Sequence, residues 1–369
     1  MKIVIDSKDF TAAVLSVIKA LPGKTSMPML EGVFLEAKEN SILLKCSDLM
    51  MQKEVVLQGD VEEEGTVILP GKLLSEICRK LPDEVLEMQT DENSVLMKCG
   101  RSKSRLQMIP YEPFPDMIFR EGSVSVSMKP EQLRNLINGT AFAASQDDSK
   151  AILMGVLMET EENTVTMVAT DAFQFAMRKE RTEESLERYS IVIPSKTVQE
   201  ISRMTEESAD DIVSFRFTDT HIRVQINNSS LTARLLEGNY INYRSILPKE
   251  NTTRVMIDRN ELMESIDRAQ LMAREDSNSN IVMHFSEGNL RITALSSFGT
   301  ANENIPAQIS GEDLEIAFNP KYCMNILRAV PDEKIYMDFT TNISPCVVKP
   351  SSGDQYYYLI VPVRIYSQF

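Results

Sequence analysis

Hydrophobic and polar positions follow a helical period in three short stretches of the chain. In residues 71–81 the apolar side chains recur every three or four positions, and the charged side chains fall on the opposite side. Such spacing predicts an amphipathic helix with one packed face and one charged face. Residues 195–205 and 320–330 repeat the pattern. Each stretch begins at a turn that joins Pro to Gly, Ser or Asn, a combination that favours a helix start.

The three stretches also share the order of their residues. A lysine opens each helix, an isoleucine follows five residues later, and an arginine follows seven residues later. Lys72, Lys196 and Lys321 are 124 and 125 residues apart, so each step is close to one third of the 369-residue chain. A single helix of this kind is usually a solvated surface helix. Three copies at one spacing predict one domain used three times.

A second pattern, with period two, fills the segments between the helices. Each third opens with a strand-like stretch and a longer amphipathic pattern, which predicts helices at 8–21, 130–144 and 259–274. The β-rich segments that follow are separated by turn residues and predict hairpins. The sixteen-residue step from Gly32 to Asp48 recurs from Gly155 to Asp171. The predicted fold is α+β, with two helices packed on antiparallel sheets in each of three tandem domains.

Polar, turn-rich stretches near 113–122 and 248–253 predict the borders between these domains. The predicted domains are 1–120, 121–250 and 251–369. Three such units in a row leave a strand edge exposed at each end of the chain. Exposed edges invite pairing with other strands. Closing them against a second copy of the chain is one remedy.

The distribution of charge changes the interpretation of the net charge of −15. An acidic protein is at first sight a poor partner for nucleic acid. The six predicted helices, however, carry a net charge of +6, which leaves −21 for the rest of the chain. An acidic shell around basic helices would repel nucleic acid from outside and tolerate it along one surface. No apolar run approaches eighteen residues, and residues 1–6 lack a signal-peptide core, so a cytoplasmic protein without a membrane span is expected.

Residues suited to catalysis are sparse. His221 and His284 stand far apart in strand-like patterns, and the five cysteines form no Cys-x-x-Cys pair. Clustered ligands of the kind that zinc needs are missing, so no metal or cofactor is expected, and the cysteines are expected to be reduced core residues. Acidic pairs at 147–148 and 210–211 leave a metal-dependent hydrolase as a minority alternative, although acids on a turn more often cap it.

Several short motifs carry a resemblance along the whole chain. They are residues 22–30 (Pro-Gly-Lys-Thr-Ser-Met-Pro-Met-Leu), 77–82 (Ile-Cys-Arg-Lys-Leu-Pro), 100–102 (Gly-Arg-Ser), 168–171 (Val-Ala-Thr-Asp), 243–248 (Tyr-Arg-Ser-Ile-Leu-Pro), Phe318-Asn319 with Tyr322, and 361–364 (Val-Pro-Val-Arg). In their order and spacing, together with the threefold repeat, they resemble the bacterial DNA sliding clamps, the beta subunits of DNA polymerase III.

The resemblance implies a non-catalytic, ring-shaped processivity factor. Two three-domain chains would join head to tail into a ring with a closed sheet outside and helices inside. The ring would encircle duplex DNA, slide without sequence specificity and tether the DNA polymerase III alpha subunit. The clamp loader and other polymerases and repair proteins carrying clamp-binding peptides are further implied partners. Two alternatives remain: a repeat scaffold that binds only proteins, and the hydrolase.

The resemblance and the repeat together assign residues to three kinds of site. DNA-binding positions are Lys24, Lys72, Arg79, Lys150, Lys196, Arg203, Lys321 and Arg328. The partner-peptide cleft is lined by Ile152, Leu153, Thr170, Phe173, Phe175, Ile241, Ile246, Asn319, Tyr322, Ile343, Leu359, Val361, Pro362, Val363 and Arg364. The dimer interface contains Ile77, Leu81, Arg101, Lys103, Leu106, Leu271, Met272 and Glu303.

Two departures from the family pattern bear on function. Many relatives have Gly-His-Arg after the Thr-Asp pair, whereas this chain has Ala172-Phe173-Gln174. This difference predicts a cleft of altered shape and peptide preference. In the family pattern a cluster of acidic residues faces the basic residues across the dimer interface, and in this chain that cluster is reduced to Glu303. A dimer of different strength is therefore expected.

Overall fold

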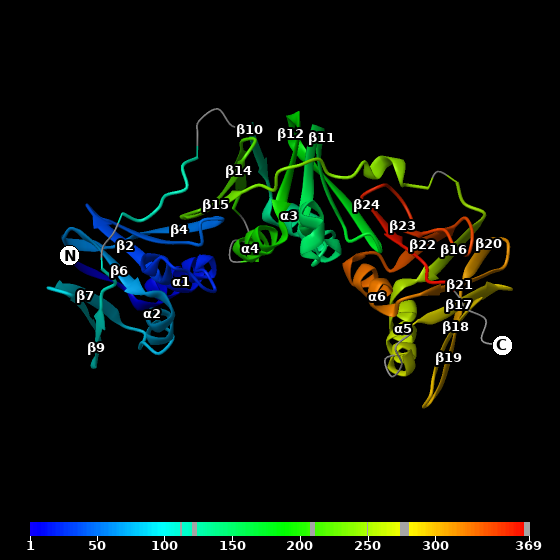
Figure 1. Ribbon diagram of the computed structural model, residues 1–369, viewed down its shortest axis with the longest axis horizontal. Helices are drawn as coiled ribbons and strands as arrows, with labels where there is room; N and C mark the ends of the chain where they lie inside the picture. The colour runs from blue at the N-terminus through cyan, green and yellow to red at the C-terminus, as the bar shows by residue number, and fades with distance from the viewer. Residues whose placement is uncertain (111–112, 120–123, 207–210, 249, 274–279, 365–369) are drawn as a thin grey trace. The chain divides into compact units, whose positions relative to one another are not determined.

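The structure is a computed structural model that describes residues 1–110, 113–119, 124–206, 211–248, 250–273 and 280–364. The chain divides into two compact units, one of residues 1–130 with 203–235 and one of residues 131–202 with 236–369 (Figure 1). Parts of the two predicted domain borders, at 120–122 and 249, lie outside the described residues. The same holds for Asp210 and for Arg274, the predicted last residue of a helix.

The first unit contains two antiparallel sheets and two helices. The five-stranded sheet has the order β5 (Asp60–Glu63), β1 (Lys2–Asp6), β7 (Val85–Asp91), β8 (Ser94–Cys99), β9 (Ser102–Gln107). The eight-stranded sheet has the order β10 (Val124–Met128), β13 (Val213–Phe217), β14 (His221–Ile226), β15 (Ser229–Arg234), β4 (Met51–Gln58), β3 (Ser41–Ser47), β2 (Gly32–Lys38), β6 (Gly65–Pro70). The helices are α1 (Ser7–Val17) and α2 (Gly71–Cys78), with short 3₁₀ turns at Ile18–Ala20 and Pro28–Glu31.

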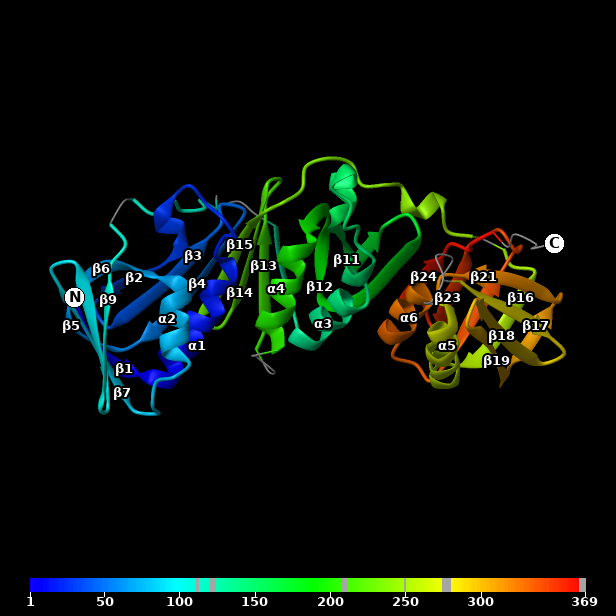
Figure 2. The ribbon, with the colours of Figure 1, turned by 60° about the horizontal axis from the view of Figure 1, so that its bottom comes forward.

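Helix α1 shows why these residues form a helix. The Asp6 side chain accepts hydrogen bonds from the backbone N–H groups of Lys8 and Asp9 and so caps the first turn. Phe10 and Val14 lie on one face and are completely buried. This face packs against α2 and against strands β3 and β4, and the two helices lie side by side (Figure 2).

The second unit repeats this plan. Its seven-stranded sheet has the order β11 (Gly155–Thr170), β12 (Gln174–Pro194), β24 (Tyr356–Ile360), β23 (Cys346–Pro350), β22 (Lys334–Phe339), β16 (Thr253–Asp258), β20 (Gln308–Gly311). Its four-stranded sheet has the order β19 (Gly299–Pro306), β18 (Asn289–Ser296), β17 (Ile281–Ser286), β21 (Leu314–Phe318). The helices wholly or mainly in this unit are α3 (Pro130–Asn138), α4 (Ser195–Glu206), α5 (Arg259–Ala273) and α6 (Pro320–Ala329), with 3₁₀ turns at Ala141–Ala143, Asp148–Met154 and Tyr243–Ser245.

The predicted α+β class and all six predicted helices are confirmed. The predicted ends of α1, α2 and α3 were too late. Helices α1 and α3 stop at Val17 and Asn138, and only short 3₁₀ turns follow them. Helix α2 ends at Cys78 instead of Leu81.

The repeat extends to atomic detail in one turn. Asp48 accepts hydrogen bonds from the N–H groups of the second and third residues after it, and the residue between, Leu49, has φ +69°. Asp171 accepts the same two bonds, and Ala172 has φ +79°. The left-handed conformation costs a residue with a Cβ roughly 1–2 kcal/mol, so the aspartate bonds stabilise a strained turn in both repeats.

Strands of neighbouring repeats join into continuous sheets in both units. In the first unit β4 pairs with β15, with Met51 opposite Ala233 and Val55 opposite Ser229. In the second unit β12 pairs with β24, with Gln174 opposite Ile360 and Arg178 opposite Tyr356. The second repeat therefore shares its strands between the two units, which is why the chain forms two compact units from three repeats.

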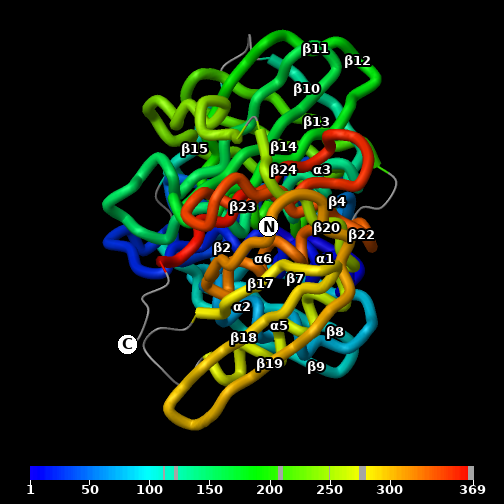
Figure 3. Tube along the Cα trace, turned by 90° about the vertical axis from the view of Figure 1, so that its right-hand side faces the viewer, coloured from blue at the N-terminus to red at the C-terminus, as the bar shows by residue number. Residues whose placement is uncertain are grey.

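In the first and in the third repeat, one strand lacks the neighbour that its equivalent strands have elsewhere in the chain. Strand β9 corresponds to β15 and β24, and it is the last strand of the five-stranded sheet. Strand β19 corresponds to β4 and β12, and it is the first strand of the four-stranded sheet, beside β18 and β17 (Figure 3). Neither has a second neighbour among the described residues.

Candidate nucleic-acid face and partner cleft

The basic residues predicted to contact DNA lie on the open faces of equivalent helices. Lys72 and Arg79 border α2, Lys196 and Arg203 lie on α4, and Lys321 and Arg328 lie on α6; all six are exposed. Each helix is fixed by its opposite face, where Leu74 of α2, Ile201 of α4 and Ile326 of α6 are buried. Exposed cations of this kind can contact phosphate groups without reading sequence.

The two remaining predicted DNA-binding residues lie outside these helices. Lys24 is exposed in the loop before the 3₁₀ turn Pro28–Glu31. Lys150 is half-buried, and its ammonium group lies 5.8 Å from the centre of the Phe173 ring. Lys150 therefore borders the predicted partner cleft.

A buried hydrophobic cluster forms the floor of the predicted cleft. It consists of Leu157, Val168, Phe175, Met177, Val192, Tyr243, Val347 and Leu359. Phe175 and Leu359 were predicted cleft residues, and Ile152 packs against the cluster. Sequence reasoning missed Met177 and Tyr243. Met177 could have been found, because it lies two residues after Phe175 on one strand and therefore on the same face.

Several of the other predicted cleft residues are exposed aromatic or aliphatic side chains. The Phe173 ring is 54% exposed and stacks on Tyr322 with 6.0 Å between ring centres and 7° between ring planes. Ile241, Ile246, Ile343 and Val361 are also exposed. Leu153 is half-buried. Exposed apolar side chains around a buried floor are typical of a site that binds an apolar peptide anchor.

The turn at Asp171 determines which side chains reach the cleft. It turns Gln174 inward, where the side chain is only 4% exposed. The Gln174 Nε2 group donates to Asp171 Oδ2, and Gln174 Oε1 accepts from Asn325. Thr170 is buried and donates its hydroxyl to the Gln174 carbonyl at 2.7 Å. This part of the turn therefore offers the cleft the Phe173 ring, while the Gln174 side chain points away from it.

The C-terminal segment lines the same region. The Val361 N–H donates to the Phe173 carbonyl at 2.9 Å, and the Val363 N–H donates to the Ala317 carbonyl at 2.8 Å. Pro362 is half-buried and Arg364 is exposed. The Asn319 side chain accepts from the Lys321 N–H and caps α6, so one of its polar groups is already used.

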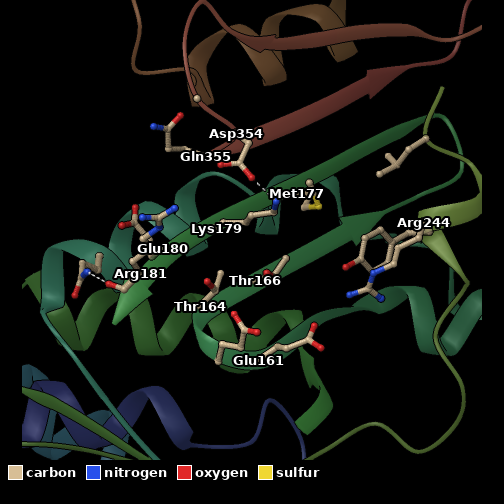
Figure 4. A pocket seen from close by; sticks show the side chains of 15 residues that line it. Glu161, Thr164, Thr166, Met177, Lys179, Glu180, Arg181, Arg244, Asp354 and Gln355 are labelled. Carbon is tan, nitrogen blue, oxygen red and sulfur yellow. Dashed lines mark hydrogen bonds and ion pairs between the residues drawn. The ribbon is translucent and has the colours of Figure 1, made fainter. Parts of the chain in front are cut away.

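A wider groove adjoins the cluster on the face of β11 and β12 that carries Thr166 and Met177. It has a volume of about 880 Å³ and is lined by residues that include Met177, Lys179, Arg181 and Asp354 (Figure 4). Lys179 pairs with Asp354 at 2.7 Å. The Tyr243 hydroxyl donates to Glu159 at 2.6 Å, and burial together with this bond raises its pKa, so the phenol stays protonated.

The predicted interface residues lie at both ends of the chain. Arg101 and Lys103 are exposed beside or on β9, Ile77 and Leu81 are half-buried, and Leu106 is buried within its own unit. In the other unit Leu271 is 55% exposed and Met272 is half-buried. Leu295 and Phe298, which were not among the predicted residues, are 64% and 77% exposed beside β19. Glu303 forms an ion pair with Arg268 of the same chain.

Within the described residues, no group of three or more His, Cys, Asp or Glu side chains is arranged to hold a metal ion. Asp147 instead accepts two bonds from Ser149 and caps a 3₁₀ turn.

All five cysteines are free and buried, as predicted, and burial raises the pKa of Cys78 and Cys323 to about 12. None of the described helices has the length and apolar character needed to cross a membrane.

Comparison with known proteins covers nearly the whole chain. Three sequence families match it: "DNA polymerase III beta subunit, N-terminal domain" at residues 1–118, the "central domain" at 127–242 and the "C-terminal domain" at 244–364. A beta sliding clamp of Staphylococcus epidermidis is 31% identical over 95% of both chains. The crystal structure of a putative DNA polymerase III beta subunit from Eubacterium rectale is 31% identical and has a TM-score of 0.94, covering 99% of this chain and 100% of its own. The Bacillus subtilis clamp is 28% identical with a TM-score of 0.95 at the same coverage.

Proposed function

The chain belongs to the family of DNA polymerase III beta subunits, the bacterial sliding clamps, and from this we propose how its own residues bind DNA, close a ring and hold partners. Its role is that of a non-catalytic processivity factor in DNA replication, and its general partners are DNA and DNA polymerase III. Its three repeats correspond to the three matched domains. We place their borders near residues 120 and 250 and place the protein in the cytoplasm.

The exposed basic residues of α2, α4 and α6 form the proposed DNA face, with Lys24 and Lys150 as additional contacts. Three equivalent helices present a lysine near the start and an arginine seven residues later. Such cations attract phosphate groups at every step along a duplex and do not distinguish sequences. Their modest number and exposure suit a protein that must slide. Retention on DNA then depends on enclosure and not on affinity.

The proposed ring closes through the two unpaired strand edges. In both units the strand equivalent to β19 pairs with the strand equivalent to β9 in one register. Applying that register to a second copy places Gly299 opposite Leu106, Ala301 opposite Ser104 and Glu303 opposite Ser102. The pairing would bring the exposed Leu271, Leu295 and Phe298 to the junction. Because β9 and β19 are at opposite ends of the chain, the contact is head to tail.

The cleft around Phe173, Tyr322 and the buried cluster is the proposed docking site for partner peptides. Its exposed apolar side chains and buried floor fit an apolar anchor. We propose the polymerase III alpha subunit, the clamp loader, and other polymerases and repair proteins with clamp-binding peptides as its occupants. The change to Ala172-Phe173-Gln174 makes the cleft more aromatic and less charged, so its preferred peptide should differ from that of relatives.

The function is tested most simply on circular DNA. The protein is loaded onto a nicked circular plasmid by a clamp loader, and bound and free protein are separated by gel filtration. Enclosure predicts that the protein stays on the circle and is released once a restriction enzyme linearises it. Release from intact circles would contradict a ring. A protein-only scaffold would bind the peptide but not stay on either DNA.

A further inference from the structure

A second pocket lies on the opposite side of the seven-stranded sheet from the groove in Figure 4. It has a volume of about 370 Å³ and is formed by residues of α3, α6 and β12. Helices α3 and α6 lie on the same side of this sheet (Figures 1 and 2). A water molecule takes up about 30 Å³ in the liquid. The pocket therefore admits a group much larger than water.

Arg178 is the buried cation of this pocket. It is 8% exposed, and its Nε has no hydrogen-bond partner among the described residues. The carboxylate that pairs with it, Glu180, lies 3.8 Å from Nη2, too far for a hydrogen bond. A buried guanidinium with an unused donor is costly unless something pairs with it.

Other donors converge on the same pocket. Arg328 of α6 is exposed and makes no ion pair with a described residue. Asn138 adds an amide group to the lining, which also contains Asn135 and Asn325, whose side chains bond Glu180 and Gln174. The buried Tyr358 hydroxyl lies close to Arg178 but makes no well-formed hydrogen bond with a described residue. Burial raises the pKa of Tyr358 to about 12, so the hydroxyl remains protonated and able to donate.

The fold makes room for Arg178 in a specific way. Gly139 follows α3, and a Cβ there would come within 2.5 Å of Arg178 Cδ and 3.2 Å of the Tyr358 hydroxyl. The repeat itself does not require a cation at this place, because the equivalent residues of β4 and β19 are Val55 and Glu303. The arginine is thus particular to the second repeat.

We propose that this pocket binds a phosphate group, held by the guanidinium groups of Arg178 and Arg328. Two cations and several neutral donors on one wall match the charge and the oxygen atoms of phosphate. The lining also contains Phe142, Val330 and Pro331, against which an attached sugar can pack. The phosphate can come from a DNA backbone or from a free nucleotide. Only the DNA source rests on the proposed clamp function.

The experiment separates these sources with two probes. Phosphorus NMR of adenosine monophosphate, with inorganic phosphate in parallel, measures binding of free phosphate to the full chain. Fluorescence anisotropy with a labelled duplex, over a series of salt concentrations, measures DNA binding. The variants are R178M and R328Q. The control is R188Q, which changes an arginine that is 77% exposed on β12.

If the nucleotide binds the native chain, and binds R328Q and R178M about tenfold more weakly, the pocket is a site for free phosphate. A DNA affinity that falls in both variants, with a salt dependence lower by about one phosphate contact, assigns it to the backbone. Unchanged binding of both probes in both variants overturns the proposal. If R178M does not fold, R328Q with the nucleotide probe keeps the test decisive, because Arg328 is exposed and its loss would lower the DNA affinity through the proposed DNA face alone. Retention on circular DNA in that negative case would leave the clamp function intact.

Discussion

Arg268 of α5 holds Glu303 of β19 through two hydrogen bonds, from Nε at 3.1 Å and from Nη2 at 2.7 Å, both to Oε2. Glu303 was the acid expected from the sequence to face a second copy of the chain. Its charge is instead paired within its own chain. Closure of the ring should therefore depend on main-chain pairing and apolar contact more than on charge.

This relationship predicts unequal effects of two substitutions on self-association. Leu271→Asp should weaken the dimer at least tenfold, because burying a leucine contributes roughly 1.5–3 kcal/mol and an aspartate there would be desolvated. Glu303→Gln should change the dimer constant by less than about fivefold, since exposed ion pairs contribute at most about 1 kcal/mol. Sedimentation equilibrium measures both. A larger effect of Glu303→Gln would contradict this account of the interface.

The helix lysines should control DNA binding without supporting the fold. Replacing Lys72, Lys196 and Lys321 by Glu is expected to lower the affinity for duplex DNA. The slope of log affinity against log salt should fall by about 0.9 for each phosphate group that the variant no longer neutralises. The free energy of unfolding should stay within about 1 kcal/mol, because all three side chains are exposed. The matched control reverses Lys38, Arg188 and Lys334, which are exposed on strands. Equally weakened DNA binding in the two triple variants would refute a DNA face on the helices.

A substitution in the turn beside the cleft should make the protein more stable. Ala172 has φ +79°, which glycine adopts without steric cost. Ala172→Gly is expected to raise the free energy of unfolding by about 1 kcal/mol, as measured by urea denaturation. Peptide affinity should change little, because the Asp171 bonds to Phe173 and Gln174 remain. A destabilised variant would mean that this turn is not strained.

The Phe173 side chain should contribute a large part of the free energy of peptide binding in the cleft. Phe173→Ala removes an exposed ring that stacks on Tyr322, and it should weaken binding of a labelled polymerase alpha-subunit peptide about tenfold or more. Ile212→Ala, at a 67% exposed isoleucine of the first unit, is the control and should bind normally. Truncation before Val361 should abolish binding as well. Normal affinity in both cleft variants would remove the cleft assignment.

An acid-sensitive ion pair supports the third repeat. Burial tends to raise the pKa of Asp338, but hydrogen bonds from Arg254 and Lys349 outweigh it and hold the pKa below 3.8. The stabilisation is thus complete above about pH 4 and is lost as the pH falls through the lowered pKa. Asp338→Asn should cost about 2 kcal/mol at pH 7, and this difference should shrink below pH 4. A difference independent of pH would contradict the ion-pair explanation.

The repeat made the helices predictable, because Lys72, Lys196 and Lys321 each follow a helix-start turn on a fixed spacing. It did not predict how repeats share sheets. The pairing of Met51 with Ala233 joins segments 182 residues apart, and no local pattern encodes such a partner. The long hairpin of β11 and β12, whose pairing is interrupted by register shifts near Glu162, was likewise beyond local signals.

At the candidate sites, residue type was predictable and orientation was not. Phe175 and Leu359 have the apolar strand pattern and lie in the buried cluster. Gln174 belongs to the segment that the family pattern places at the cleft, yet it turns inward to Asn325. Arg178 has the sequence context of an ordinary strand cation. Only the packing of Gly139 and Tyr358 around it reveals a buried guanidinium.

Ring closure through β9 and β19 can be measured directly by disulfide cross-linking. Residues directly opposite on antiparallel strands are close enough for a disulfide, and the buried native cysteines should not compete. A chain carrying Ala301→Cys and Ser104→Cys should oxidise to a covalent dimer of twice 41.7 kDa and no further. A pair shifted by one residue, Ala301→Cys with Arg105→Cys, should cross-link poorly. A ladder of higher multimers would contradict the closed ring, and a chain that stays monomeric would contradict the pairing itself.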